Sequence, residues 1–298
     1  MRRFTWRAVL GVAGVVAMLP GVVFAVIYVR FQCFPGRNPT RGTPADVGLT
    51  YQEVRRTGAD GINTVGWYIP PISAPAPSVC LIHGHASRKE QLLENAAMLH
   101  RGGFGVALFD LRQHGDSDAA VCTIGVREAE DVRPWIAYLR ARPEHAGRKL
   151  GLLGYSMGAV TALHTAAVCP EVATVVADSP FASLSDEVRF RLSRIVPESL
   201  NGYTWFFTLS VGCLTTQQLP SSWEVTGWLP QIAPRPVLLI HGTDDQNIPC
   251  TATEQLARAG GPNVQSWLVP HAGHTQARKH DPAAYETRVN GFLRQALN

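Results

Sequence analysis

Short runs of apolar residues alternate along most of this chain with longer stretches that have helical spacing. The runs consist of Val, Leu, Ile and Ala without polar alternation, which is typical of strands buried on both faces of a parallel sheet. Alternating strands and helices predict such a sheet, flanked by helices. The predicted strands are residues 78–82, 104–110, 149–155, 173–178, 236–241 and 264–269, and the predicted helices are residues 88–101, 126–141, 157–168, 251–259 and 282–297.

Two regions depart from this alternation. Residues 51–56 and 62–69 have β-type composition and are separated by turn residues, so we expect an opening hairpin. Residues 181–232 separate two predicted strands and contain helical and aromatic segments instead of a further strand. We expect this region to be a helical cap inserted into the catalytic domain, which we place at residues 50–298.

The N-terminal region is apolar in a different way. Residues 8–29 contain no charge and, as a helix, would extend about 33 Å, which is enough to cross a membrane. We therefore expect a membrane anchor at residues 1–30, followed by a Pro- and Gly-containing linker at residues 31–49. Two alternatives are a signal peptide cleaved after Ala25 and a buried core helix.

The distribution of arginines favours one orientation of such an anchor. Arg2, Arg3 and Arg7 precede the apolar segment and place its N-terminus on the cytoplasmic side. The catalytic domain would then lie outside the cytoplasm, or would be secreted after cleavage. Arginines at positions 30, 37 and 41 weaken this assignment.

Charge and cysteine content exclude other classes of protein. The net charge of +4 is modest and gives no reason to expect a nucleic-acid partner. The six cysteines include no C-x-x-C pair, so we expect neither a zinc site nor a thioredoxin-type site, and we assign no disulfide. No metal or organic cofactor is expected, and the oligomeric state stays open.

One motif places a serine between a strand and a helix. Residues 154–158 read G-x-S-x-G and follow an apolar run that is succeeded by a helix-forming stretch. Such a turn exposes the side chain of Ser156, and the amide of Met157 lies at the helix N-terminus, where an oxyanion would form. Ser156 is therefore the candidate nucleophile, and the alternative is an ordinary helix-capping serine.

A serine hydroxyl needs a base, and the base needs an acid to orient it. Acidic residues follow the predicted strand at 236–241, where either Asp244 or Asp245 is suitable. Three histidines follow the next strand or lie just beyond it. They are His271, His274 and His280.

These motifs together resemble those of the α/β-hydrolase superfamily. The resemblance covers residues 50–298 and includes H-G-x-x-D-x-x-I-P at 241–249, A-G-H at 272–274 and D-x-R-x-H-G-x-S at 110–117. It implies that Asp245 is the acid and His274 the base, in the chain order serine, aspartate, histidine. Asp178, at the end of the sixth strand, is a second candidate for the acid.

The resemblance also implies a second oxyanion donor in the loop after the strand at 78–82, where we assign the backbone amide of His85. The expected function is that of a serine hydrolase acting on small-molecule or lipid-like carboxylic esters, as carboxylesterases and lipases do. Alternatives are a peptidase of the serine aminopeptidase-like type, a thioesterase, an acyltransferase and a non-catalytic interaction protein.

Overall fold

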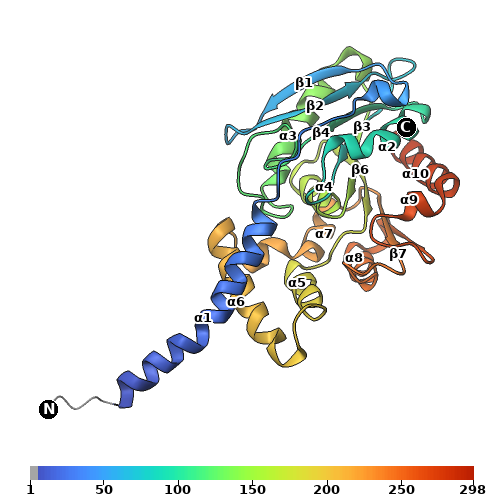
Figure 1. Cartoon of the computed structure of the whole chain (residues 1–298). Helices are drawn as coiled ribbons and strands as arrows, with labels where there is room; N and C mark the ends of the chain where they lie inside the picture. Colours follow the sequence, from blue (N-terminus) through green and yellow to red (C-terminus); the bar gives the residue numbers. More distant parts are fainter. Residues whose placement is uncertain (1–5) are drawn as a thin grey trace.

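A twisted sheet forms the centre of the molecule in the computed structural model, which describes the backbone of residues 6–298 and the side chains of residues 17–298 (Figure 1). The described strands have the order β1-β2-β4-β3-β5-β6-β7-β8. β1 pairs with β2 and β2 with β4 in antiparallel fashion, and the other pairs are parallel. The strands are β1 (Gln52–Thr57), β2 (Asn63–Ile69), β3 (Ser78–Ile82), β4 (Gly105–Phe109), β5 (Leu150–Tyr155), β6 (Val172–Asp178), β7 (Val237–Gly242) and β8 (Val264–Val269).

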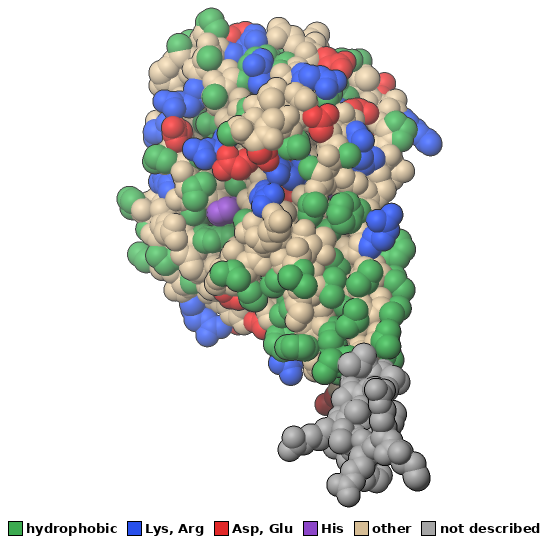
Figure 2. Space-filling model, turned by 90° about the vertical axis from the view of Figure 1, so that its left-hand side faces the viewer, with side chains coloured by type: hydrophobic (Ala, Val, Ile, Leu, Met, Phe, Trp, Pro, Cys, Tyr) green, Lys and Arg blue, Asp and Glu red, His purple; other side chains and the backbone are tan. Residues whose placement is uncertain are grey.

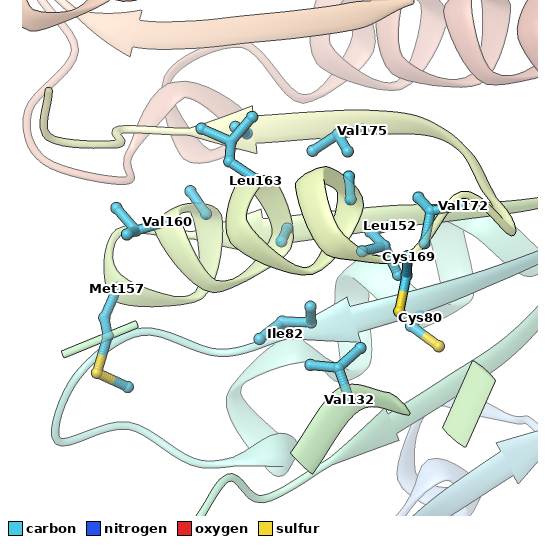
Figure 3. Packing of buried hydrophobic residues seen from close by; sticks show 14 of the residues in the cluster. Cys80, Ile82, Val132, Leu152, Met157, Val160, Leu163, Cys169, Val172 and Val175 are labelled. Atoms are coloured by element: carbon cyan, nitrogen blue, oxygen red, sulfur yellow. The ribbon is translucent and has the colours of Figure 1, made fainter. Parts of the chain in front are cut away.

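Helices cover both faces of this sheet, which confirms the predicted fold class. Successive residues of β5 point to opposite faces, so that Leu152 belongs to one hydrophobic cluster and Leu153 to the other. On the first face, α4 packs through Leu163 against this strand layer (Figure 3). The first face is covered by α3 (Glu128–Arg140), α4 (Met157–Val168) and α8 (Thr251–Gly260), and the second by α2 (Leu93–Arg101) and α10 (Pro282–Leu297).

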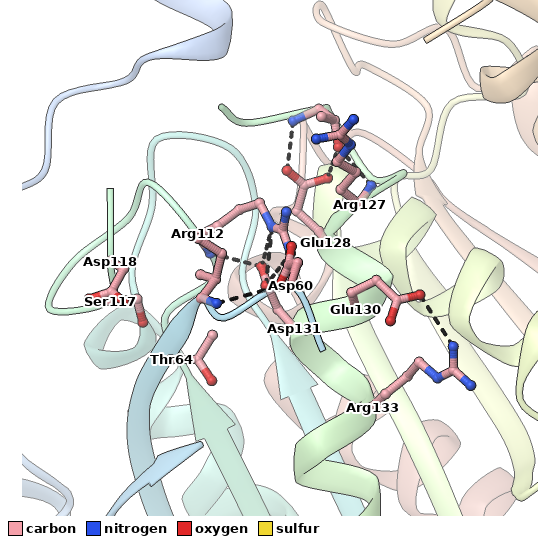
Figure 4. Close-up of polar contacts among 12 residues, drawn as sticks. Asp60, Thr64, Arg112, Ser117, Asp118, Arg127, Glu128, Glu130, Asp131 and Arg133 are labelled. Carbon is pink, nitrogen blue, oxygen red and sulfur yellow. Dashed lines mark hydrogen bonds and ion pairs between the residues drawn. The ribbon is translucent and has the colours of Figure 1, made fainter. Parts of the chain in front are cut away.

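The turn after β4 is fixed by buried charges. The guanidinium of Arg112 is almost fully buried, and its Nη2 lies 2.7 Å from Oδ1 of Asp131 on α3 and 2.8 Å from Oδ2 of Asp60 (Figure 4). Nearby, the carboxylate of Glu128 accepts hydrogen bonds from the amide and hydroxyl of Thr123. The motif at 110–117 therefore serves to hold loops in place.

The chain between β6 and β7 leaves the sheet and forms the cap. The cap contains α5 (Leu184–Leu192), α6 (Glu198–Thr216) and the short α7 (Leu229–Ile232). The N-terminal helix α1 (Trp6–Cys33) lies beside α6 (Figure 1). A short helix, α9 (Ala277–His280), precedes α10.

The segment that we expected to be a linker is instead bonded to the domain. The Lys89 ammonium donates to the hydroxyl of Thr40 at 2.8 Å, and the amide of Gly42 donates to Glu90 at 3.0 Å. The linker prediction relied on composition, and composition does not report polar contacts with distant parts of the chain. Residues 34–49 therefore run along the domain surface, and α1 does not end in a free tether.

The predicted anchor can be compared with the structure only in part. Among the described residues, no helix has a stretch that is both long and apolar enough to cross a membrane. Residues 8–16 of the predicted span lie outside the residues whose side chains are described.

Candidate active site

Ser156 occupies a strained turn between β5 and α4. Its backbone angles are φ 54° and ψ −119°, which a serine rarely adopts. A Cβ atom on Gly158 would lie 2.3 Å from the carbonyl oxygen of Ile82, so that position of the motif has room only for glycine. The turn therefore projects the Ser156 side chain beyond the carboxyl ends of the parallel strands, where ligand sites of such sheets lie.

Three predicted side chains meet at this edge. Nε2 of His274 lies 2.9 Å from Oγ of Ser156, and Nδ1 lies 2.7 Å from Oδ2 of Asp245. The other oxygen of Asp245 accepts hydrogen bonds from the amides of Asn247 and Ile248, at 2.8 and 2.9 Å. The imidazole is thus held between a carboxylate and a hydroxyl, in the geometry that general-base catalysis requires.

The acid has a further partner that the sequence analysis missed. His241, at the end of β7, is fully buried, and its Nε2 lies 3.1 Å from Oδ2 of Asp245. Burial alone raises the pKa of Asp245, but hydrogen bonds from His241 and His274 outweigh it, and the pKa is well below its usual range. His241 stands in the H-G-x-x-D motif, so the motif itself contained the signal.

The alternative acid and the alternative base, Asp244 and His271, face the solvent. The side chain of Asp244 is 55% exposed and is 3.6 Å from the imidazole of His271, which is itself 82% exposed. His280 is exposed on α9. These groups therefore form part of the solvent-facing surface.

Asp178 is near the site but in a different role. Its backbone oxygen accepts a hydrogen bond from the amide of Ser156 at 2.8 Å, while its carboxylate accepts from the Tyr285 hydroxyl at 3.0 Å. Burial raises the pKa of Asp178 to about 6. Since its carboxylate is bonded to tyrosine and serine hydroxyls, Asp178 supports the turn and does not orient His274.

The two expected oxyanion donors flank Ser156. Within the described part of the chain, the backbone amides of His85 and Met157 have no protein hydrogen-bond acceptor. The imidazole of His85 points elsewhere, with Nε2 donating to the carbonyl of Gln32 on α1 at 2.8 Å. His83 is buried below the site, where its Nε2 accepts from the amide of Leu111. Only the backbone of His85 is therefore available at Ser156.

Comparison with proteins of known structure decides the fold. The structure superimposes on an esterase of Pyrococcus furiosus, Pf2001, with a TM-score of 0.74, over 90% of this chain and 99% of that chain at 25% identity. The fold is that of the α/β-hydrolases.

Sequence comparisons agree with this fold. The profile of the serine aminopeptidase S33 family matches residues 73–210. The chain is also similar to YqkD of Bacillus subtilis, with 27% identity covering 83% of this chain and 82% of YqkD. It is 28% identical to Rv2307c of Mycobacterium tuberculosis, over 94% of this chain and 91% of that protein. These findings support a hydrolase.

In this α/β-hydrolase fold, an apolar pocket adjoins Ser156 and is enclosed by the cap and by α1. The wall from α1 was not expected, because the sequence analysis treated residues 1–30 as a separate anchor. The pocket-lining residues include Tyr28 and Val29 of α1, Leu184 and Val188 of α5, and Thr208, Leu209 and Gly212 of α6.

One charged pair lies in the wall of this apolar pocket. Glu187 and Arg191, one turn apart on α5, form an ion pair, and burial raises the pKa of the Glu187 carboxyl. A buried carboxylate is expensive unless it is paired, and Arg191 supplies the partner. No group of His, Cys, Asp or Glu side chains in the described residues is arranged to hold a metal ion.

Proposed function

We propose that this protein is a serine esterase that cleaves carboxylic esters with an apolar acyl group. The observation that supports the proposal is the hydrogen-bonded series from Ser156 through His274 to Asp245, placed directly beside an apolar pocket. Such a pocket favours an acyl chain over a polar substrate. An esterase is also among the similar solved structures.

In the first half of the reaction, Oγ of Ser156 attacks the ester carbonyl while Nε2 of His274 accepts its proton. Asp245 holds the imidazole in position and stabilises the imidazolium. The amides of His85 and Met157 bind the oxyanion of the tetrahedral intermediate. His274 then gives the proton to the departing alcohol, which leaves an acyl group on Ser156.

In the second half, water takes the place of the alcohol. His274 accepts a proton from the water as it attacks the acyl carbonyl, and returns the proton to Oγ of Ser156 as the acid leaves. The same two amides bind the oxyanion again.

Peptide hydrolysis is the second candidate, because the matching family profile is described as a serine aminopeptidase. An aminopeptidase needs a free acidic group to bind the substrate ammonium. The carboxylate in this pocket, Glu187, is already paired with Arg191. The pairing favours an uncharged acyl group and hence an ester.

The test uses the full chain and a series of p-nitrophenyl esters from acetyl to palmitoyl. Ser156→Ala should lower kcat by at least about 10³-fold, because the nucleophile is lost. Ser266→Ala, at an exposed position on β8, is the control and should leave kcat unchanged. Full turnover by Ser156→Ala, or release of amines from short peptides in preference to esters, would contradict the proposal.

The role of the pocket in binding the acyl group can be tested with two substitutions on α6. Gly212 on α6 lines the pocket, whereas Gly202 on the same helix is exposed and does not line it. Gly212→Phe should reduce kcat/KM for octanoyl ester about tenfold relative to acetyl ester, because the ring occupies acyl space. Gly202→Phe should keep the wild-type ratio.

A further inference from the structure

Helices α1 and α6 pack closely where α1 has a small residue, and both expose large apolar side chains on their outer faces. Between residues 21 and 33 of α1, every fourth residue is buried, and two of these are Gly21 and Ala25. The residues beside them are large and exposed, with Val23 at 51% and Ile27 at 53% exposure. This is the reverse of the pattern in a water-soluble helix, where large apolar residues face the interior.

The cap helix α6 shows the same inversion. Its buried positions include Thr204, Thr208 and Thr216, while Phe206 is 58% exposed and Leu214 is 80% exposed. A small residue such as Gly21 at a close helix contact is typical of helix pairs surrounded by lipid.

A side chain of α6 also forms hydrogen bonds with backbone groups of α1. Pro20 lies inside α1 and lacks an amide hydrogen. Close to it, the hydroxyl of Tyr203 on α6 accepts from the amide of Gly21 at 3.0 Å and donates to the carbonyl of Ala17 at 2.6 Å. In lipid, backbone groups freed by a proline must be bonded by neighbouring helices, because no water is present.

Charges are scarce on this pair. Between residues 17 and 33 the sequence has one charged residue, Arg30, and in α6 it has one, Glu198, at the first position. Figure 2 shows that hydrophobic side chains gather at this end of the molecule, whereas charged side chains are concentrated on the catalytic domain. A protein-binding surface usually has a polar rim, whereas the exposed large side chains on the described part of α1 and on α6 are mainly apolar.

We propose that the outer faces of α1 and α6 lie in a lipid bilayer, so that the cap as well as the N-terminal helix is embedded. The occupant of this surface is a lipid surface and not a second copy of the chain. The membrane contact would then be a surface of two helices, both of which also contribute to the pocket wall. It holds whatever bond the active site cleaves.

The test places a reporter on α6. The full-length protein carrying Leu214→Trp is bound to phosphatidylcholine–phosphatidylglycerol vesicles whose phosphatidylcholine has brominated acyl chains. At least about half of the added indole fluorescence should be quenched, because bromine quenches only on contact with the acyl region. The matched control is Ile72→Trp, since Ile72 is 66% exposed in the loop before β3. Its added fluorescence should not be quenched.

A second measurement uses charge. Introducing Val23→Glu, Ile27→Glu and Leu214→Glu together should lower the ratio of vesicle-bound to free protein at least about tenfold, since charged groups are costly in lipid. Val168→Glu with Ile72→Glu should not lower it, and thermal unfolding of both variants verifies that they are folded. The proposal is overturned if the indole of Leu214→Trp is not quenched. It is also overturned if size-exclusion chromatography shows a dimer that Leu214→Glu dissociates. Ester turnover enters neither measurement, so failure of the esterase proposal would leave both results interpretable.

Discussion

Nε2 of His241 lies 3.1 Å from Oδ2 of Asp245, the same oxygen that contacts the imidazole of His274. Nε2 of His241 also lies 3.1 Å from the carbonyl oxygen of Ile248, and its Nδ1 lies 2.9 Å from the hydroxyl of Thr253. Because the two oxygens near Nε2 can only accept, Nε2 carries a proton and donates to them. His241 therefore acts as a donor that holds the carboxylate in place.

Replacing His241 should weaken catalysis although this side chain acts through Asp245 and does not contact the substrate. His241→Leu removes the donor and should lower kcat by about tenfold to a hundredfold, because the carboxylate that orients His274 becomes misplaced. His241→Gln keeps an amide donor and should lose less. Steady-state kinetics with a short ester separates kcat from KM, and KM should not change. Equal losses in the two variants would show that Asp245 does not depend on this donor.

The assignment of the acid can be tested by two adjacent substitutions. Asp245→Asn should lower kcat about 10⁴-fold, since an amide can neither fix the tautomer of His274 nor stabilise its charge. Asp244→Asn changes an exposed side chain and should have an effect of less than about twofold. The measurement is kcat for the same ester at neutral pH. The reverse order of effects would move the acid to Asp244.

Three histidines beneath the site make stability depend on pH. Burial lowers the pKa of His114 to about 3, and it lowers the pKa values of His83 and His85 as well. When the pKa of a histidine is lower in the folded state, the unfolded state binds more protons as the pH falls. Its contribution is therefore complete above the unfolded pKa of about 6.5 and declines as the pH falls towards the folded pKa.

His114→Gln should thus reduce the acid sensitivity of the fold. Between pH 6.5 and 5, the free energy of unfolding should fall by about 2 kcal/mol less than in the wild type, at about 1.4 kcal/mol per pH unit. Urea unfolding at the two pH values measures this difference. His280→Gln, at an exposed position, should leave the wild-type dependence intact. An unchanged dependence in His114→Gln would contradict the prediction.

One buried hydroxyl in the described residues has no hydrogen-bond partner. It belongs to Thr208 on α6, whereas the hydroxyl of Thr204, one turn earlier, donates to the carbonyl of Leu200 at 2.9 Å. Thr208→Val should raise the free energy of unfolding by about 1 kcal/mol, because it removes an unsatisfied polar group at nearly constant volume. Thr204→Val should not stabilise, and thermal unfolding compares the two.

Much of the site could be predicted because its chemistry is local in sequence. The strand before Ser156 and the helix after it are visible in residues 149–168, and the loops with Asp245 and His274 each follow an apolar run. Because parallel strands end at the same edge of the sheet, the loops that follow them lie close together. For this reason the three side chains could be assigned before their distances were known.

The surroundings of the site could not be predicted in the same way. Hydrophobic periodicity indicates that Val23 and Ile27 belong to an apolar helix, but not which neighbour the helix meets. The contact of α1 with α6 depends on Tyr203, which lies more than 180 positions away in the chain. Likewise, the bonds from Lys89 and Glu90 that hold residues 34–49 are long-range polar contacts without a sequence period.

The share of the pocket wall that comes from α1 affects how the natural substrate range can be measured. Shortening the chain to begin at residue 31 is an obvious way to improve handling, but it removes Tyr28 and Val29 from beside the acyl space. Such a sample would keep Ser156, Asp245 and His274 and could still turn over small esters. Its preference for acyl length would describe a pocket with one side missing, so substrate profiles from trimmed and complete chains are not interchangeable.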